Sequence, residues 1–168
     1  MKKVLSFICL LCCLFLLFGC DPGTHHIDKD ELIANTVKIE LYDYENEDPK
    51  LLRINGKKKP KFDFDDATFI ATLDESHFDA ILEDIAAREY LDFGRALNEP
   101  MGKTLVLHQS NGNIIVLFGC TYTDEDDETR YSGECYVFDE YGALVEYIGR
   151  VGYTFSDHIV STYFQSNS

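Results

Sequence analysis

The residues best suited to bind a metal ion form an acidic run in the second half of the chain. Asp124, Asp126 and Glu128 alternate with other residues, and crowded carboxylate oxygens are the ligands that a hard cation such as Ca²⁺ prefers. An EF-hand loop starting at Asp124 would need glycine at its sixth position and a bidentate glutamate at its twelfth. Thr129 and Cys135 stand there instead. The run is therefore a weak calcium candidate, and a solvated hairpin tip is the favoured interpretation.

Two of the six cysteines are placed for a disulfide. Cys120 and Cys135 lie in strand-like runs over residues 113–122 and 131–139. If the hairpin between these runs folds symmetrically about residues 127–128, the two sulfurs face each other at a Cα separation that a disulfide can bridge. We therefore expect a disulfide between Cys120 and Cys135. The alternative is two free thiols packed as small hydrophobic groups.

Catalytic motifs are absent from the sequence. The chain has no Gly-x-Ser-x-Gly nucleophile motif, no His-Glu-x-x-His motif and no phosphate-binding glycine loop. The five histidines share no spacing that indicates a common site; they are His25, His26, His77, His108 and His158. We therefore predict that the protein is not an enzyme and that it uses no cofactor. An enzyme with two paired carboxylates is the alternative, and no particular pair among the 30 acidic residues is indicated.

An amphipathic helix is the clearest element of secondary structure. Asp74 is a suitable N-cap, and apolar residues recur from Phe78 to Ala86 at spacings of three and four, which predicts about four helical turns. Strand-like runs lie on both sides of this helix, over residues 35–44, 50–54, 67–73, 104–110, 113–122, 131–139 and 144–149. The last segment, residues 156–164, is either a short helix capped by Ser156 or a strand.

The pair Asn-Gly at residues 111–112 lies between two of these runs and is the strongest short-range signal for a hairpin. With these two residues as the turn, Leu105 lies opposite Phe118 and Leu107 lies opposite Val116. We predict an α+β fold in which an antiparallel sheet packs against one amphipathic helix. The sheet combines a four-stranded meander in the C-terminal half of the chain with the N-terminal strands.

The first twenty residues have the layout of an export signal. Two lysines precede an almost unbroken apolar run over residues 4–18, which is short for a helix that must span a bilayer. The run closes with Leu-Phe-Gly-Cys at residues 17–20, which resembles the lipobox of bacterial lipoproteins, although Phe18 is a less usual occupant of its position. The resemblance implies that Cys20 is acylated and becomes the first residue of the mature chain. The alternative is an uncleaved N-terminal anchor helix.

This resemblance divides the chain into a signal peptide over residues 1–19, a lipidated tether over residues 20–34 and a single globular domain over residues 35–168. Without the two lysines of the signal, the net charge falls from −15 to −17. Such a charge disfavours nucleic acid and anionic lipid headgroups as partners. The expected partners are the membrane, reached through the N-terminal lipid, and an envelope protein or wall component.

The predicted function is therefore that of a non-catalytic binding domain, tethered by lipid to the extracytoplasmic face of the cell membrane. Aromatic side chains such as Tyr131, Tyr136 and Phe138 suit a recognition surface on the sheet, or else they lie beneath the helix or the N-terminal strands. The alternative functions are a cell-surface hydrolase that uses paired carboxylates and a calcium-binding surface domain.

Overall fold

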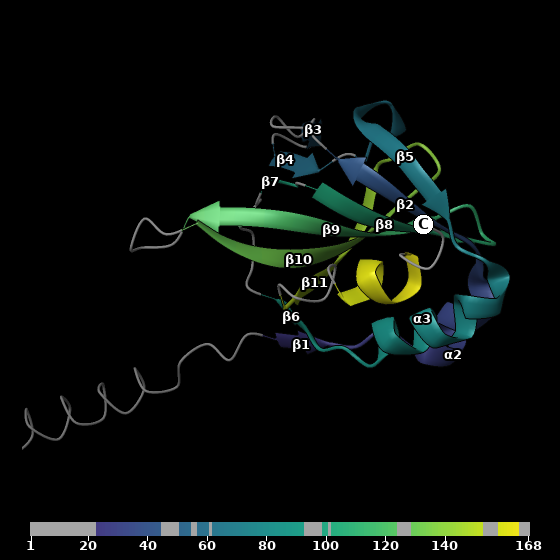
Figure 1. The fold of residues 1–168 in the computed structure, drawn as a ribbon. Helices are drawn as coiled ribbons and strands as arrows, with labels where there is room; N and C mark the ends of the chain where they lie inside the picture. Colours follow the sequence, from purple (N-terminus) through teal and green to yellow (C-terminus); the bar gives the residue numbers. More distant parts are fainter. Residues whose placement is uncertain are drawn as a thin grey trace, which may run out of the picture.

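The computed structural model describes residues 23–44, 51–54, 57–60, 62–92, 99–100, 102–123, 129–152 and 158–164. One large antiparallel sheet dominates this part of the chain, and the helices lie together against one side of it (Figure 1). The predicted α+β class and the antiparallel sheet are thereby confirmed.

Nine strands of the described part belong to this sheet: β1 (Gly23–His25), β2 (Thr36–Tyr44), β5 (Ala67–Thr72), β6 (Tyr90–Asp92), β7 (Glu99–Pro100), β8 (Gly102–Gln109), β9 (Ile114–Thr123), β10 (Thr129–Phe138) and β11 (Leu144–Val151). Their order is β1-β6-β11-β10-β9-β8-β2-β5, and β7 pairs with β9. Strands β8 to β11 lie side by side in the sheet in the order in which they follow one another along the chain. A separate hairpin is formed by β3 (Leu51–Ile54) and β4 (Lys57–Pro60).

The described chain contains several short helical segments, whereas the sequence predicts one amphipathic helix. The Asp74 side chain accepts a hydrogen bond from the Ser76 amide and caps a short 3₁₀ turn, η2 (Glu75–His77), which leads into α3 (Phe78–Ala86). The apolar side chains Ile81, Leu82 and Ile85 of α3 are buried as expected. A second helix, α2 (Lys29–Asn35), packs beside α3, and further turns are η1 (Phe64–Asp66) and the π-helical η3 (Val160–Phe164). No helix in the described ranges is both long and apolar enough to span a membrane.

The folded domain begins earlier than predicted, because part of the expected tether belongs to it. Strand β1 pairs with β6, and the Asp28 side chain caps α2 by accepting a hydrogen bond from the Glu31 amide. Leu32 of α2 is only 2% exposed and lies in the core. A seven-residue helix with one fully buried side chain carries too little periodicity to be recognised in the sequence.

Each face of the sheet contributes to a cluster of buried side chains. The helix face packs against α2, α3 and the C-terminal segment, and its strands contribute mainly aliphatic side chains: Ile39, Leu105, Leu107, Ile115, Leu117, Cys135 and Val151. The opposite face, called the aromatic face here, contains more aromatic side chains. Its strands contribute Tyr42, Val106, Ile114, Val116, Phe118, Tyr136 and Phe138. Phe62 covers the aromatic face through ring contacts with Phe118 and Phe138, and its amide donates to the carbonyl of Gly142 at 3.1 Å.

The register of the hairpin between β8 and β9 differs by one residue from the predicted one. Leu105 lies opposite Leu117 rather than Phe118, and Leu107 lies opposite Ile115 rather than Val116. The reason is a three-residue turn, since the Gln109 amide bonds to the carbonyl of Asn113 and the turn therefore includes Ser110 as well as Asn-Gly. Gly112 adopts a φ of 90°, which suits glycine.

The register of β9 and β10 also corrects the predicted cysteine pairing. Cys120 lies opposite Ser132, and Cys135 lies opposite Leu117, which is three residues along β9 from Cys120. Three residues of a strand span about 10 Å, beyond the Cα separation that a disulfide can bridge. Cys135 is instead a free, fully buried thiol on the helix face, and burial raises its pKa. The observed register of β9 and β10 therefore differs from one that is symmetric about residues 127–128.

Candidate functional site

The aromatic face holds a nearly buried carboxylate, Glu40 of β2, whose oxygens bind three side chains. His108 Nε2 lies 2.6 Å from Oε2, the Tyr42 hydroxyl donates to the same oxygen at 3.0 Å, and Lys38 Nζ lies 3.1 Å from Oε1. An ionised carboxylate can only accept, so His108 carries a proton on Nε2. Phe64 of η1 stacks on the imidazole ring. The sequence indicated none of these partners for His108.

Burial and hydrogen bonding act in opposite directions on this cluster. Burial alone would raise the pKa of Glu40, but hydrogen bonds from Lys38, His108 and Tyr42 outweigh it and hold that pKa below its usual value. Burial lowers the pKa of His108, aided by Lys38 and opposed by Glu40. Burial and the hydrogen bond to Glu40 raise the pKa of Tyr42 to about 12. The cluster therefore favours an ionised Glu40 beside a neutral His108.

A second buried carboxylate, Glu134 of β10, lies on the same face and is 1% exposed. The Tyr136 hydroxyl donates a short hydrogen bond to Oε2, and Arg150 Nε of β11 donates to Oε1 at 3.1 Å. Both carboxylates thus accept from the tyrosine two residues later on their own strand. Each is neutralised by a cation from its own strand or a neighbouring strand.

These two carboxylates do not form the pair that a glycosidase needs. Glu134 and Glu40 lie on strands three steps apart in the sheet, which is about 14 Å at the usual strand spacing. Retaining and inverting glycosidases hold their two carboxyl groups about 5 to 9.5 Å apart. The described geometry gives both groups a structural role within the face.

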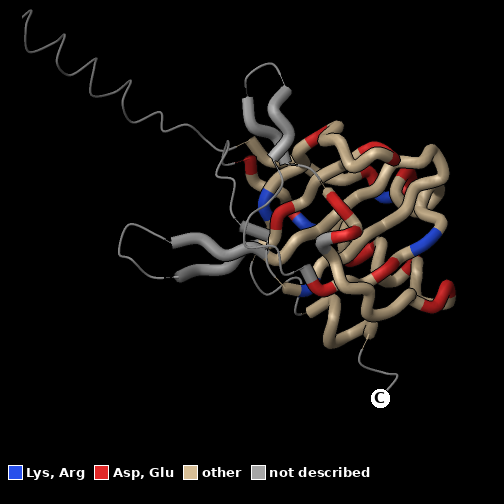
Figure 2. Tube along the Cα trace, turned by 90° about the horizontal axis from the view of Figure 1, so that it is seen from above, with Lys and Arg blue, Asp and Glu red and all other residues tan. Residues whose placement is uncertain are grey.

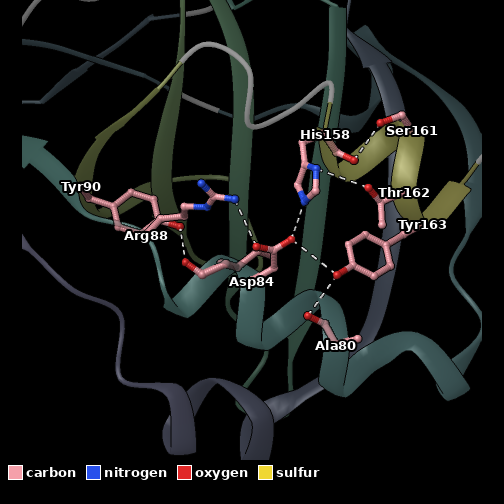
Figure 3. A network of polar contacts seen from close by, with 9 residues as sticks. Ala80, Asp84, Arg88, Tyr90, His158, Ser161, Thr162 and Tyr163 are labelled. Carbon is pink, nitrogen blue, oxygen red and sulfur yellow. Dashed lines mark hydrogen bonds and ion pairs between the residues drawn. The ribbon is translucent and has the colours of Figure 1, made fainter.

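A third polar cluster joins α3 to the C-terminal segment (Figure 3). Asp84 Oδ2 lies 2.8 Å from His158 Nε2, and Asp84 Oδ1 accepts from Arg88 at 3.2 Å. On the other side of the ring, His158 Nδ1 lies 3.4 Å from the hydroxyl of Thr162, and the Tyr163 hydroxyl donates to the carbonyl of Ala80 at 3.3 Å.

This cluster contains the carboxylate, imidazole and hydroxyl groups that also make up a nucleophilic triad, and its contacts join two segments of the chain. Thr162 is one helical turn from His158 on the same segment, so the contact is local. The contacts of His158 and Tyr163 with α3 hold Ile159, which is 2% exposed, in the helix-face core. The cluster therefore fastens the C-terminal segment onto α3. The sequence left residues 156–164 open as either a short helix or a strand, and the structure shows a helical segment over residues 158–164.

Several predicted site residues lie outside the described part of the chain. These are Cys20 and the acidic run with Asp124, Asp126 and Glu128. Within the described ranges no group of three metal-binding side chains is found. His25 of β1 lies 4.0 Å from Asp92 of β6, at the edge of the sheet.

The helix face contains a small pocket that is lined mainly by apolar side chains, among them Leu41, Leu105, Ile159 and Val160. Its free volume is about 10 Å³. That is the space of a single water molecule, whereas sites for small organic ligands occupy hundreds of cubic ångströms. This pocket is a packing defect beside the C-terminal segment.

Exposed aromatic side chains gather at one edge of the sheet, where the sequence did not predict them. Phe69 of β5 is 53% exposed and Phe64 of η1 is 42% exposed. Both rings contact Tyr42, at centroid distances of 5.7 and 5.6 Å. Of the residues proposed from the sequence as a recognition surface, Tyr136 and Phe138 are buried; the ring of Phe138 contacts Phe62, and the ring of Tyr136 contacts Phe118 and Tyr147. The side chain of Tyr131 is outside the described set.

Comparisons with known proteins identify no relative. No family model matches the chain, and neither a curated protein nor a solved structure is significantly similar to it.

Proposed function

We propose that the protein is a lipid-tethered domain on the extracytoplasmic face of the cell membrane, where it binds an envelope protein or wall component without catalysing a reaction. The observation that carries the binding role is the exposure of Phe64 and Phe69 beside an uncharged edge strand. Large exposed aromatic side chains that cluster on a surface are typical of interaction sites.

The tether is supported by the sequence before the domain. Cys20 follows the apolar run over residues 4–18, and strand β1 begins at Gly23, so an acylated Cys20 would lie within a few residues of the sheet along the chain. Three acyl chains, as the lipoprotein resemblance implies, anchor a domain without a second signal, because each buried methylene contributes about 0.8 kcal/mol. β1 and β5 are the first and last strands of the sheet order, so the N-terminal end of the described chain lies at the edge opposite the exposed aromatic rings (Figure 1).

The test of the tether is metabolic labelling of the full chain with a fatty-acid analogue in bacteria. We expect Cys20→Ser to abolish the label and to release the protein or retain it as precursor. Cys13→Ser is the matched control, because it removes another thiol from the same segment and leaves Cys20 in place; it keeps the label. Label that persists in Cys20→Ser, or that is lost in Cys13→Ser alone, contradicts the assignment of Cys20.

A further inference from the structure

We propose that the outer edge of β5 binds an extended peptide segment with basic flanking residues, which adds to the sheet as a further strand. The inference rests on the binding role proposed above and names its surface and the chemistry of its partner. Addition of a strand to an open sheet edge is a known mode of peptide recognition, in which main-chain hydrogen bonds supply most of the affinity.

Strand β5 is the open edge of the sheet. In the described part of the chain it pairs with β2 only, and it ends the strand order (Figure 1). Its sequence, Ala-Thr-Phe-Ile-Ala-Thr, contains no charged residue and no proline, the residues by which edge strands usually discourage pairing. The opposite edge, β1, has only three residues and carries His25 near Asp92. The two edges therefore differ in their capacity to accept a strand.

A β-bulge limits how much of β5 can pair. The register passes from Ala71 opposite Leu41 to Phe69 opposite Tyr42, which leaves Ile70 as the extra residue. A bulge bends its strand, so an added segment pairs with the straight part, residues 67–69. A contact of this length is short, and we expect transient binding and not a permanent complex.

Two exposed rings lie at the straight part of β5. Phe69 belongs to this part of the strand, and Phe64 of η1 contacts the same Tyr42 ring as Phe69 does. Side chains on adjacent strands that share a face lie about 5 Å apart. An added strand would therefore place its alternate side chains against Phe69, and its apolar residues would cover a ring that is now half exposed.

The charges at both ends of β5 favour a basic segment over a second copy of this chain. Asp63 and Asp65 directly precede the straight part of β5, and Asp74 and Glu75 follow the strand beyond the bulge. Parallel pairing of two copies would align the leading acids of both copies, and antiparallel pairing would place the leading acids of each copy beside the end of the partner's paired segment. Acidic residues also outnumber basic residues along the rest of the described chain (Figure 2). Lysine or arginine on both sides of a partner strand would turn this repulsion into attraction.

The test uses the full chain in nonionic detergent and two labelled peptides of alternating valine and threonine. One peptide has two lysines at each end, and the other has two glutamates. We expect the lysine-flanked peptide to bind by fluorescence anisotropy at least about tenfold more tightly. Hydrogen exchange should show new protection at residues 67–69. Phe69→Ser should weaken peptide binding about fivefold. Tyr141→Ser, which removes an exposed aromatic ring between β10 and β11, should leave the affinity unchanged.

Equal binding of both peptides, protection confined to other strands, or an unchanged affinity in Phe69→Ser would each overturn the assignment. Sedimentation that shows a dimer of the chain which Phe69→Ser dissociates would assign the edge to a second copy instead. Acylation is measured on the same preparation. An acylated chain that does not bind the lysine-flanked peptide overturns the edge assignment alone, and an unacylated chain that binds it overturns the tether alone.

Discussion

The helix face of the sheet is filled by aliphatic side chains under regular helices, whereas the aromatic face is covered by Phe62 and its neighbours and contains two buried carboxylates. Aliphatic side chains need only shape complementarity, so the strand side chains of the helix face are stabilised mainly by packing. Rings with hydroxyl groups bring polar atoms into the interior, and these atoms need partners. Glu40 and Glu134 supply acceptors for Tyr42 and Tyr136, at the cost of burying charge.

The largest expected effect on stability comes from a substitution that removes the cation beside Glu134. Arg150→Met keeps an apolar stem but takes away the donor to a carboxylate that is 1% exposed, so we expect a loss of about 3–5 kcal/mol in the free energy of unfolding. The double variant Glu134→Gln/Arg150→Met should recover more than half of this loss in chemical denaturation. A double variant as unstable as Arg150→Met would mean that the stem of Arg150 and not its charge stabilises the aromatic face.

Smaller losses of stability are expected from substitutions that test whether both faces of the sheet contribute to the core. Leu107 and Val106 are adjacent on β8, point to opposite faces and are both fully buried. We expect Leu107→Ala to cost about 3 kcal/mol and Val106→Ala about 2 kcal/mol in denaturant unfolding. Val145→Ala, at an exposed position of β11, is the control and should cost less than about 0.5 kcal/mol. A neutral Val106→Ala would show that the cover on the aromatic face contributes little.

The smallest effect is the pH dependence of the aromatic face. The pKa of His108 is lowered in the folded chain from its reference value of 6.5, so the unfolded chain binds the proton first as the pH falls. This contribution to stability is complete above pH 6.5 and is lost as the pH falls through the lowered pKa. We expect the melting temperature to fall by a few degrees over this window.

The matched variants are His108→Gln, which should flatten this decrease, and His77→Gln, which changes an exposed histidine on η2 and should leave it intact. The pKa of Glu40 is also lowered, so its contribution is lost at still lower pH, below its reference value of 4.5. Equal slopes for His108→Gln and the unchanged protein would remove His108 as the source of the pH dependence.

Elements that depend on nearby residues were predicted well. The cap at Asp74 and the apolar stripe from Phe78 to Ala86 identified α3, because capping and periodicity act within a few residues. The Asn-Gly pair at residues 111–112 identified the turn between β8 and β9 for the same reason. The short helix α2 was missed because a single buried side chain, Leu32, gives no periodicity.

Strand register was predicted poorly, and the reason is the burial of both faces. A slip of one residue normally moves apolar side chains from the core into solvent, which makes the correct register recognisable. In β8 and β9 consecutive residues such as Val106 and Leu107 are both apolar, so the predicted and observed registers look equally favourable in the sequence. The predicted disulfide depended on such a register, and the observed one leaves Cys135 a free thiol.

The sequence by itself determined helix α3 and the turn at residues 111–112, because caps, turns and periodicity are local patterns. Only the tertiary structure decided which strand is left at the edge and which carboxylates are buried. Those outcomes depend on pairings between residues far apart in the chain, such as β2 with both β5 and β8, or Arg150 with Glu134. Local propensities do not specify such pairings when both faces of a sheet are apolar.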